Sequence, residues 1–173
     1  YQEKENNSLT AIETYLKSNK EIGLQKWYYF ILGEEDLVEK RRKNEIFARE
    51  KWQIVIKMCR FLRFFPFVKM IVASWSLALL NTKEDSDLDI FVVTQKNRIA
   101  TTRFFLVFFT KILGWYRKEW DENNKLCFNH FIAEDWIIMS AQNRYTARLY
   151  SQFIPLYGIA YFDWFKQENK WIK

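Results

Sequence analysis

The chain has 173 residues, of which 49% are hydrophobic and 19% aromatic, with only four Gly and two Pro. This length holds one good core, or a small module beside a medium one, and excludes two full-sized domains, while the apolar content excludes an intrinsically disordered chain. A net charge of +6, from 27 Lys and Arg against 21 Asp and Glu, favours a polyanionic partner such as a nucleotide, RNA or DNA over a cationic one.

The first part of the chain predicts a small helix–strand module over residues 1–35. Thr10 and Glu13 have the capping-box spacing, so a short helix is expected to start near Thr10. Residues 24–32 are rich in aromatic and β-branched side chains and end at Gly33, which predicts a strand followed by a turn.

A long connecting helix is expected over residues 36–64, because apolar residues recur at helical spacing at Trp52, Val55, Ile56, Cys59 and Leu62. Its early section carries the basic run 40–43, Lys-Arg-Arg-Lys. That run either contacts nucleic-acid phosphates or forms a solvated helix face interleaved with acidic residues.

Residues 65–173 predict an α/β (α+β) domain with a mixed sheet and flanking helices. The apolar runs indicate strands over residues 67–73, 87–94 and 125–132, a helix over 98–115, and two closing helices over 145–157 and 159–170. A polar loop, 74–86, and a charged connecting loop, 116–125, lie between these elements. In the helix, the aromatic cluster is expected in the core, and it comprises Phe104, Phe105, Phe108 and Phe109.

Cysteine and histidine are scarce. Cys59 and Cys127 lie far apart in apolar stretches, which predicts two buried thiols in a reducing compartment and hence a cytoplasmic protein. The single histidine, His130, excludes most zinc sites. No membrane span is expected, because charges and Pro66 interrupt the apolar run 61–80, and a bilayer needs roughly 20 apolar residues.

Two carboxylates mark the start of the second core strand. Asp87 and Asp89 are two residues apart, so in a strand both point to one side while Leu88 and Ile90 pack on the other. Side by side they repel each other, and a divalent cation such as Mg²⁺ (or Mn²⁺) stabilises the pair. The spacing fits phosphoryl or nucleotidyl transfer, in which the metal neutralises developing charge. The alternative is a pair that only solvates the mouth of a strand.

This region resembles the signature of the DNA polymerase β-type nucleotidyltransferase superfamily. Ser76-Leu-Ala78 precedes Ser86-Asp-Leu-Asp89 by about ten residues, as the superfamily's Gly-Ser at the head of a helix precedes its Asp-x-Asp strand. More narrowly, residues 25–170 are similar to bacterial uncharacterised nucleotidyltransferase-domain proteins, and the further matching text is Phe65-Pro-Phe-Val68, Leu126-Cys127 with Asn129, and Pro155-Leu-Tyr-Gly158.

The resemblance implies a role for each matching residue. Asp87 and Asp89 would bind Mg²⁺ as the catalytic carboxylates, and Ser76 with nearby backbone amides would hold the phosphates of an NTP. Ser74, Asn81 and Arg103 are further candidates for nucleotide binding, and Arg103 either reaches the triphosphate or pairs near its own helix. The resemblance also implies that residues 1–35 are part of a winged-helix-like module.

The chain departs from the superfamily pattern at three places. Trp75 stands where the superfamily has Gly, and Leu80 where related proteins often have a small residue, although Gly there lets a phosphate approach the backbone. The usual third carboxylate corresponds to Asn129, flanked by His130, as a third site position. Asn cannot act as a base, whereas His130 either accepts a proton or is a hydrogen-bonded core or surface group.

Two functions from different classes follow. One is a metal-dependent nucleotidyltransferase that transfers a nucleoside monophosphate from an NTP to an acceptor, which the intact carboxylate pair favours. The other, which Trp75 favours, is a catalytically degenerate protein of the same fold that binds nucleotide or nucleic acid, or serves as an antitoxin-like regulatory partner. A third alternative is a membrane-associated protein whose apolar runs face lipid.

Overall fold

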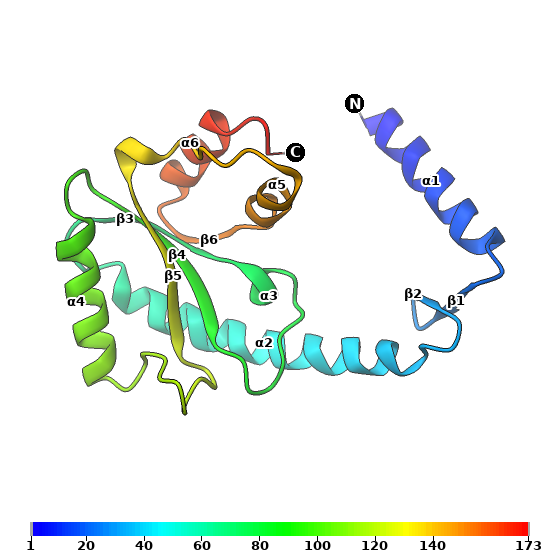
Figure 1. The fold of residues 1–173 in the computed structure, drawn as a ribbon, viewed down its shortest axis with the longest axis horizontal. Helices are drawn as coiled ribbons and strands as arrows, with labels where there is room; N and C mark the ends of the chain where they lie inside the picture. Colours follow the sequence, from blue (N-terminus) through cyan, green and yellow to red (C-terminus); the bar gives the residue numbers. More distant parts are fainter. Residues whose placement is uncertain (1, 173) are drawn as a thin grey trace. The chain divides into compact units, whose positions relative to one another are not determined.

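The computed structural model describes residues 2–172, with side chains from Leu9 onward, and has a mixed α/β, α+β architecture (Figure 1). Within that range it contains six α-helices, a four-stranded mixed sheet and a two-stranded sheet. The chain divides into two compact units, residues 1–43 and 44–173. This division falls inside the long helix α2, Asp36–Leu62, close to the span predicted for that helix.

The first unit contains α1, Gln2–Ser18, and an antiparallel hairpin of β1, Ile22–Gln25, and β2, Tyr28–Ile31. The predicted helix start near Thr10 is wrong, because α1 runs through that residue. The single strand over 24–32 is also wrong, because Lys26 and Trp27 form a two-residue turn with φ of 50° and 73°. Positive φ at both central residues matches the turn to the twist of the two strands.

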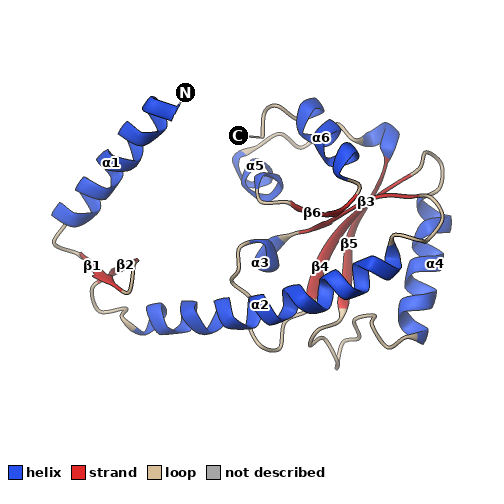
Figure 2. Ribbon diagram, turned by 180° about the vertical axis from the view of Figure 1, so that it is seen from behind, coloured by secondary structure: helices blue, strands red, loops and turns tan. Residues whose placement is uncertain are grey.

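The second unit is built on a sheet with strand order β5-β4-β3-β6 (Figure 2). The strands β4 and β5 are parallel, whereas β3 is antiparallel to both β4 and β6. The four strands are β3 (Val68–Ala73), β4 (Leu88–Thr94), β5 (Leu126–Ala133) and β6 (Ile154–Tyr157). The first three confirm the strands predicted from the sequence.

Helices cover both faces of this sheet, each over its own core. One core packs α2 and α4, Ile99–Ile112, on the side of β4 that carries Leu88 and Ile90. The other packs α5, Arg144–Ser151, and α6, Ile159–Glu168, on the side that carries Phe91 and Val93. Between β3 and β4 lies the short helix α3, Trp75–Ala78, and a 3-10 turn, Glu134–Trp136, follows β5.

The predicted helix over 145–157 is only half right, because α5 ends at Ser151 and Ile154–Tyr157 forms β6. Pro155 has no N–H and disfavours a helical conformation of the residue before it, so the helix ends upstream of it. A proline is tolerated in β6 because this strand lies at the edge of the sheet.

The expected burial of the α4 aromatic cluster is wrong. Phe104 and Phe108 are 62% and 47% exposed, and the residues of α4 that are buried are Thr102, Leu106 and Thr110. Helical spacing alone shows that apolar residues share a broad face of the helix, but it does not show which part of that face packs against the core.

Over the part of the chain that the structure describes, none of the helices has the length and apolar character needed to cross a bilayer. Both cysteines are free thiols. Cys59 is buried, as predicted, whereas Cys127 is only partly buried.

Candidate functional site

Asp87 and Asp89 lie at the start of β4 and share one side of it. One carboxylate oxygen of each aspartate and the Sγ of Cys127 all lie within 4.8 Å of one another. Leu88 and Ile90 are fully buried in the core on the opposite side. The predicted alternation along this strand is therefore confirmed, and it holds the two carboxylates next to each other.

Arg117 brings a positive charge to the pair. Its Nη1 donates a hydrogen bond to Oδ2 of Asp87 at 3.0 Å and another to Sγ of Cys127 at 3.6 Å. Its Nη2 lies 2.6 Å from a carboxylate oxygen of Glu122, and its backbone N–H donates to the carbonyl of Leu126 in β5. No spacing rule in the sequence connects Arg117 with Asp87, and residues 116–125 are predicted only as a connecting loop.

A β-bulge in β5 changes which side chains face the carboxylates. The register pairs Ile90 with Phe128 but Phe91 with His130, so Asn129 is an extra residue in β5. A bulge of this kind redirects a side chain that strict alternation would send to the other face. It brings Asn129 and His130, although consecutive, to the side of the sheet that carries Asp89.

The two predicted third-site residues behave differently. Asn129 donates a hydrogen bond from Nδ2 to Oδ1 of Asp89 and accepts one from the thiol of Cys127 at 2.9 Å. His130 is exposed, and its ring stacks on Phe91 with ring centroids 5.6 Å apart. Asn129 thus contacts the pair directly, in the place where the resemblance implies a third carboxylate.

Burial and the charge of Asp87 raise the pKa of Asp89 from 3.8 to about 6. The hydrogen bond from Asn129 and the charge of Arg117 act in the opposite direction without cancelling this shift. Burial raises the pKa of Cys127 from 9.0 to about 11, and the two aspartates add to the effect. At neutral pH the thiol therefore keeps its proton, which it donates to Asn129.

Lys51 of α2 fixes the loops that lead into β4 and β5. The side chain is 2% exposed, and its ammonium group donates to the carbonyls of Glu84 and Ser86, both at 2.8 Å. It also donates to Oδ1 of Asn123 and of Asn124, at 3.1 and 3.0 Å. Burial lowers the pKa of Lys51, and this group is absent from the residues predicted for the site. The sequence signal that could have identified Lys51 is its position on the apolar stripe of α2, where a charged residue is unexpected.

The backbone between β3 and β4 keeps the conformation that glycine favours. Trp75 has φ of 49° and Leu80 has φ of 51°, both in the left-handed region. These are the two positions where the resemblance implies Gly or another small residue. For a side chain with a Cβ this conformation costs about 1–2 kcal/mol per residue, so the rest of the loop must stabilise it.

The side chains predicted to bind phosphate near this loop differ in their exposure to solvent. Ser74 is fully buried, and its N–H and hydroxyl both donate to the carbonyl of Asp89, at 3.2 and 3.3 Å. Ser76 is partly buried, and its carbonyl accepts from the N–H of Asn81 at 2.8 Å. Asn81 is exposed, and its side-chain oxygen accepts from Asn44 at 2.9 Å.

Arg103 is exposed on α4. Its guanidinium lies over the ring of Phe131 in β5, 5.8 Å from the ring centroid. It also lines a hollow formed by α4 alone, whose lining includes neither Asp87 nor Asp89. A second hollow, of about 260 Å³, is lined by Arg117 and Cys127, and its lining likewise includes neither of these aspartates.

The donor set fits a hard divalent cation. Mg²⁺ typically takes one or two carboxylates and completes its shell with water or phosphate oxygens, and Mn²⁺ accepts the same ligands. Asp87 and Asp89 supply two such carboxylates on one face. Cys127 adds a protonated thiol, which is a poor ligand for Mg²⁺, so the carboxylates are the residues that would hold the ion.

Comparison of the chain with protein-family models, with curated proteins and with solved structures finds no match. The superfamily membership implied by the motifs around Ser76 and Asp87 therefore stays a prediction.

Proposed function

We propose that residues 44–173 form a metal-dependent nucleotidyltransferase-type domain, which transfers a nucleoside monophosphate from an NTP to an acceptor hydroxyl. The observation that carries the proposal is the pair Asp87 and Asp89, whose ligand oxygens lie close together on one face of β4. The raised pKa of Asp89 adds to it, because burial and the charge of Asp87 both disfavour the ionised carboxylate, and a bound divalent cation would offset both effects.

In this proposal Asp87 and Asp89 hold Mg²⁺ or Mn²⁺, which would neutralise charge on the NTP phosphates. Ser76, with the left-handed backbone at Trp75 and Leu80, would hold those phosphates. A backbone in that conformation turns its N–H groups toward one side, which suits an anion.

The partner classes belong to the proposal as well. NTP is the donor, and the acceptor is a nucleic acid, a protein or a small molecule. The N-terminal basic run 40–43 would contact nucleic acid as part of a winged-helix-like module in the cytoplasm. Within that run, Arg42 is paired with Glu39 at 3.4 Å, which favours the solvated-face alternative for this arginine.

Specific observations favour a second candidate, a protein that binds nucleotide or a regulatory partner without turnover. Arg117 already neutralises Asp87. Asn129 stands where a general base is implied, and an amide does not accept a proton at neutral pH. Trp75 narrows the approach to the phosphate-binding backbone.

One experiment separates the two candidates. Binding of radiolabelled NTPs is measured with and without Mg²⁺, alongside pyrophosphate release with RNA, protein or small hydroxyl compounds added as acceptors, in the native chain and in Asp87→Asn and Asp89→Asn. Transfer predicts Mg²⁺-dependent binding and pyrophosphate release in the native chain alone, whereas binding without release supports the second candidate. Asp85→Asn is the matched control, since Asp85 is an exposed carboxylate close to the pair in sequence. Absence of Mg²⁺-dependent NTP binding in the native chain would contradict nucleotidyl transfer and nucleotide binding alike, and would leave only the binding of a regulatory partner.

A further inference from the structure

A connected row of aromatic rings extends from partly buried members against the core of the second unit to exposed members on α4. Neighbouring ring centroids lie 5.2–5.8 Å apart along this row. We call it the aromatic row, and its members are Phe61, Phe65, Phe104, Phe105, Phe108, Phe109 and Trp115. Ile112 and Leu113 extend it at the end of α4 and are 65% and 43% exposed.

The helix α4 buries polar threonine side chains and exposes aromatic ones, the reverse of the usual arrangement in a surface helix. Its buried positions include Thr102 and Thr110, and the Thr110 hydroxyl donates to the carbonyl of Leu106 within the helix. Its outer positions carry Phe104 and Phe108 instead. Apolar side chains that gather on an outer helix face mark an interaction surface, whereas isolated ones are ordinary.

The two chain segments that form the aromatic row carry charges of one sign. Arg103 and Lys111 lie two turns apart on α4, and Arg63 lies over the ring of Phe64, 4.7 Å from its centroid. Neither residues 51–83 nor residues 90–118 contain an Asp or Glu. Both segments that form the row are therefore purely basic, and the surface complements a partner that is anionic and apolar together.

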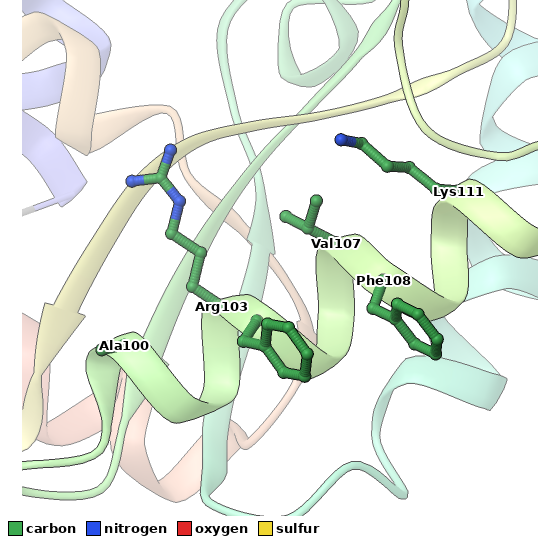
Figure 3. Close-up of a pocket in the computed structure, with 6 residues that line it drawn as sticks. Ala100, Arg103, Val107, Phe108 and Lys111 are labelled. Carbon is green, nitrogen blue, oxygen red and sulfur yellow. The ribbon is translucent and has the colours of Figure 1, made fainter.

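The shape of this surface favours a lipid surface over a folded protein as the partner. A hollow of about 480 Å³ lies along it, and all six of its lining residues belong to α4. Figure 3 shows Arg103, Val107 and Lys111 extending toward one side of the helix and Phe108 projecting from another. A partner helix normally lies in a groove with apolar walls from more than one element. Here a single helix presents exposed apolar side chains on one side and two cations on another (Figure 3).

We propose that the aromatic row docks onto an anionic phospholipid surface, with α4 lying in the plane of the headgroups. Phe104, Phe108 and Ile112 would enter the boundary of the acyl chains, while Arg103 and Lys111 extend to the lipid phosphates, as in interfacial helices. This adds a location to the proposed chemistry without resting on it.

The test is co-sedimentation of the full chain with vesicles of phosphatidylcholine alone and of equal parts phosphatidylcholine and phosphatidylserine. The native chain is expected to bind the mixed vesicles only. The double variant Phe104→Ser, Phe108→Ser is expected to bind at least about tenfold more weakly, because two buried rings are lost. Arg103→Gln and Lys111→Gln are each expected to weaken binding about fivefold.

Matched controls separate this docking from the general attraction of a basic chain to anionic lipid. Trp136→Ser removes a ring that is 73% exposed but outside the aromatic row, and Lys166→Gln removes an exposed cation of α6. Both controls are expected to bind as the native chain does. Circular dichroism checks that each variant is folded.

The proposal is overturned if the native chain does not bind the mixed vesicles, or if the serine variant binds them as strongly as the native chain. It is also overturned if sedimentation equilibrium shows a dimer that Phe108→Ser dissociates, and if neither the dimer nor the monomer binds the vesicles. In that case a second copy of the chain covers the surface.

Discussion

Arg117 and Asp87 form an ion pair in which Nη1 and Oδ2 are 3.0 Å apart, so the chain itself supplies the cation that the carboxylate pair attracts. A divalent ion at this pair competes with the guanidinium. Arg117→Gln is therefore expected to strengthen Mn²⁺ binding by about fivefold or more, because a nearby like charge is removed. Titration of each variant with Mn²⁺, followed by the signal of free Mn²⁺, measures the change.

Arg103→Gln is the control for this prediction, since it removes an equal charge that lies over the ring of Phe131 and not beside the carboxylates. It is expected to leave Mn²⁺ affinity within about twofold of native, as surface charges are largely screened at physiological salt. Weaker Mn²⁺ binding in Arg117→Gln than in the native chain would mean that Arg117 organises the carboxylates and does not compete with the ion.

The pKa of Asp89, about 6 in the folded chain, predicts a pH-dependent stability. Because this pKa lies above the ordinary value of 3.8, the folded state favours the protonated carboxyl, and the stability it contributes is lost as pH rises through about 6. Asp89→Asn removes that loss. The variant is expected to be more stable than native by on the order of 1–2 kcal/mol at neutral pH, and the gain is expected to vanish toward pH 4.

Urea unfolding at several pH values, without divalent ions, measures this effect. Asp85→Asn is the control, and its stability difference from native should stay small across the same range because Asp85 is exposed. A stability gain in Asp89→Asn that persists unchanged at low pH would show that packing, and not the charge, is responsible.

Trp75 provides a test of backbone strain. Trp75→Gly and Trp75→Ala both remove the indole, but only glycine adopts the left-handed conformation without a steric penalty. The glycine variant is therefore expected to be more stable than the alanine variant by about 1 kcal/mol, the reverse of the order in an ordinary helix. It is also expected to bind Mg²⁺-NTP more tightly than native, because the backbone becomes open to phosphate.

Equilibrium unfolding of the two Trp75 variants gives the comparison directly. The same pair of substitutions at Leu77, which lies in α3 without a positive φ, is the control, and there alanine should be the more stable variant. An equal stability of the two Trp75 variants would contradict a strained backbone at this position.

Lys51 predicts a coupling between α2 and the carboxylate loop. Lys51→Met keeps the length and apolar stem of the side chain but leaves the carbonyls of Glu84 and Ser86 without this donor. The loss is expected to cost about 3 kcal/mol or more of unfolding free energy and to weaken Mn²⁺ binding. Lys57→Met, an exposed lysine of the same helix, is the control and should change neither.

Gly158 is a position where the fold admits no side chain. A Cβ there would lie 2.0 Å from the carbonyl oxygen of Lys69 in β3, and φ is +77°. Gly158→Ala is expected to cost about 4 kcal/mol or more. Gly114→Ala has a similar φ, of +68°, with nothing within 4 Å, and is expected to cost about 1 kcal/mol. Thermal unfolding of both variants separates the close contact from the φ penalty.

The strands around the site were accessible from the sequence because their signal is local. Residues 68–73 and 88–94 are nearly continuous apolar runs, as strands buried on both faces must be. The side-by-side arrangement of Asp87 and Asp89 follows from the period of two along a strand. The edge strand β6 was not accessible in this way, because its four-residue run is short and contains Pro155, and three of its residues are held by pairing with β3, a tertiary contact.

The partners of the carboxylates were not accessible in the same way. Arg117 reaches Asp87 because the bridge between Tyr116 and Leu126 folds the loop back against β5. Cys127 follows from the parallel register with Asp89, which no local pattern fixes. The outward face of α4 was misjudged because a helix that is apolar on most sides does not reveal which side is buried.

The bulge in β5 has a chemical consequence. Asn and Asp have the same shape and differ in one terminal atom group, and the amide of Asn129 already meets Oδ1 of Asp89. Replacing that amide by a carboxyl would complete a three-acid cluster with no change of backbone. A single substitution, Asn129→Asp, would therefore place three acids together, with an oxygen where the amide nitrogen now lies.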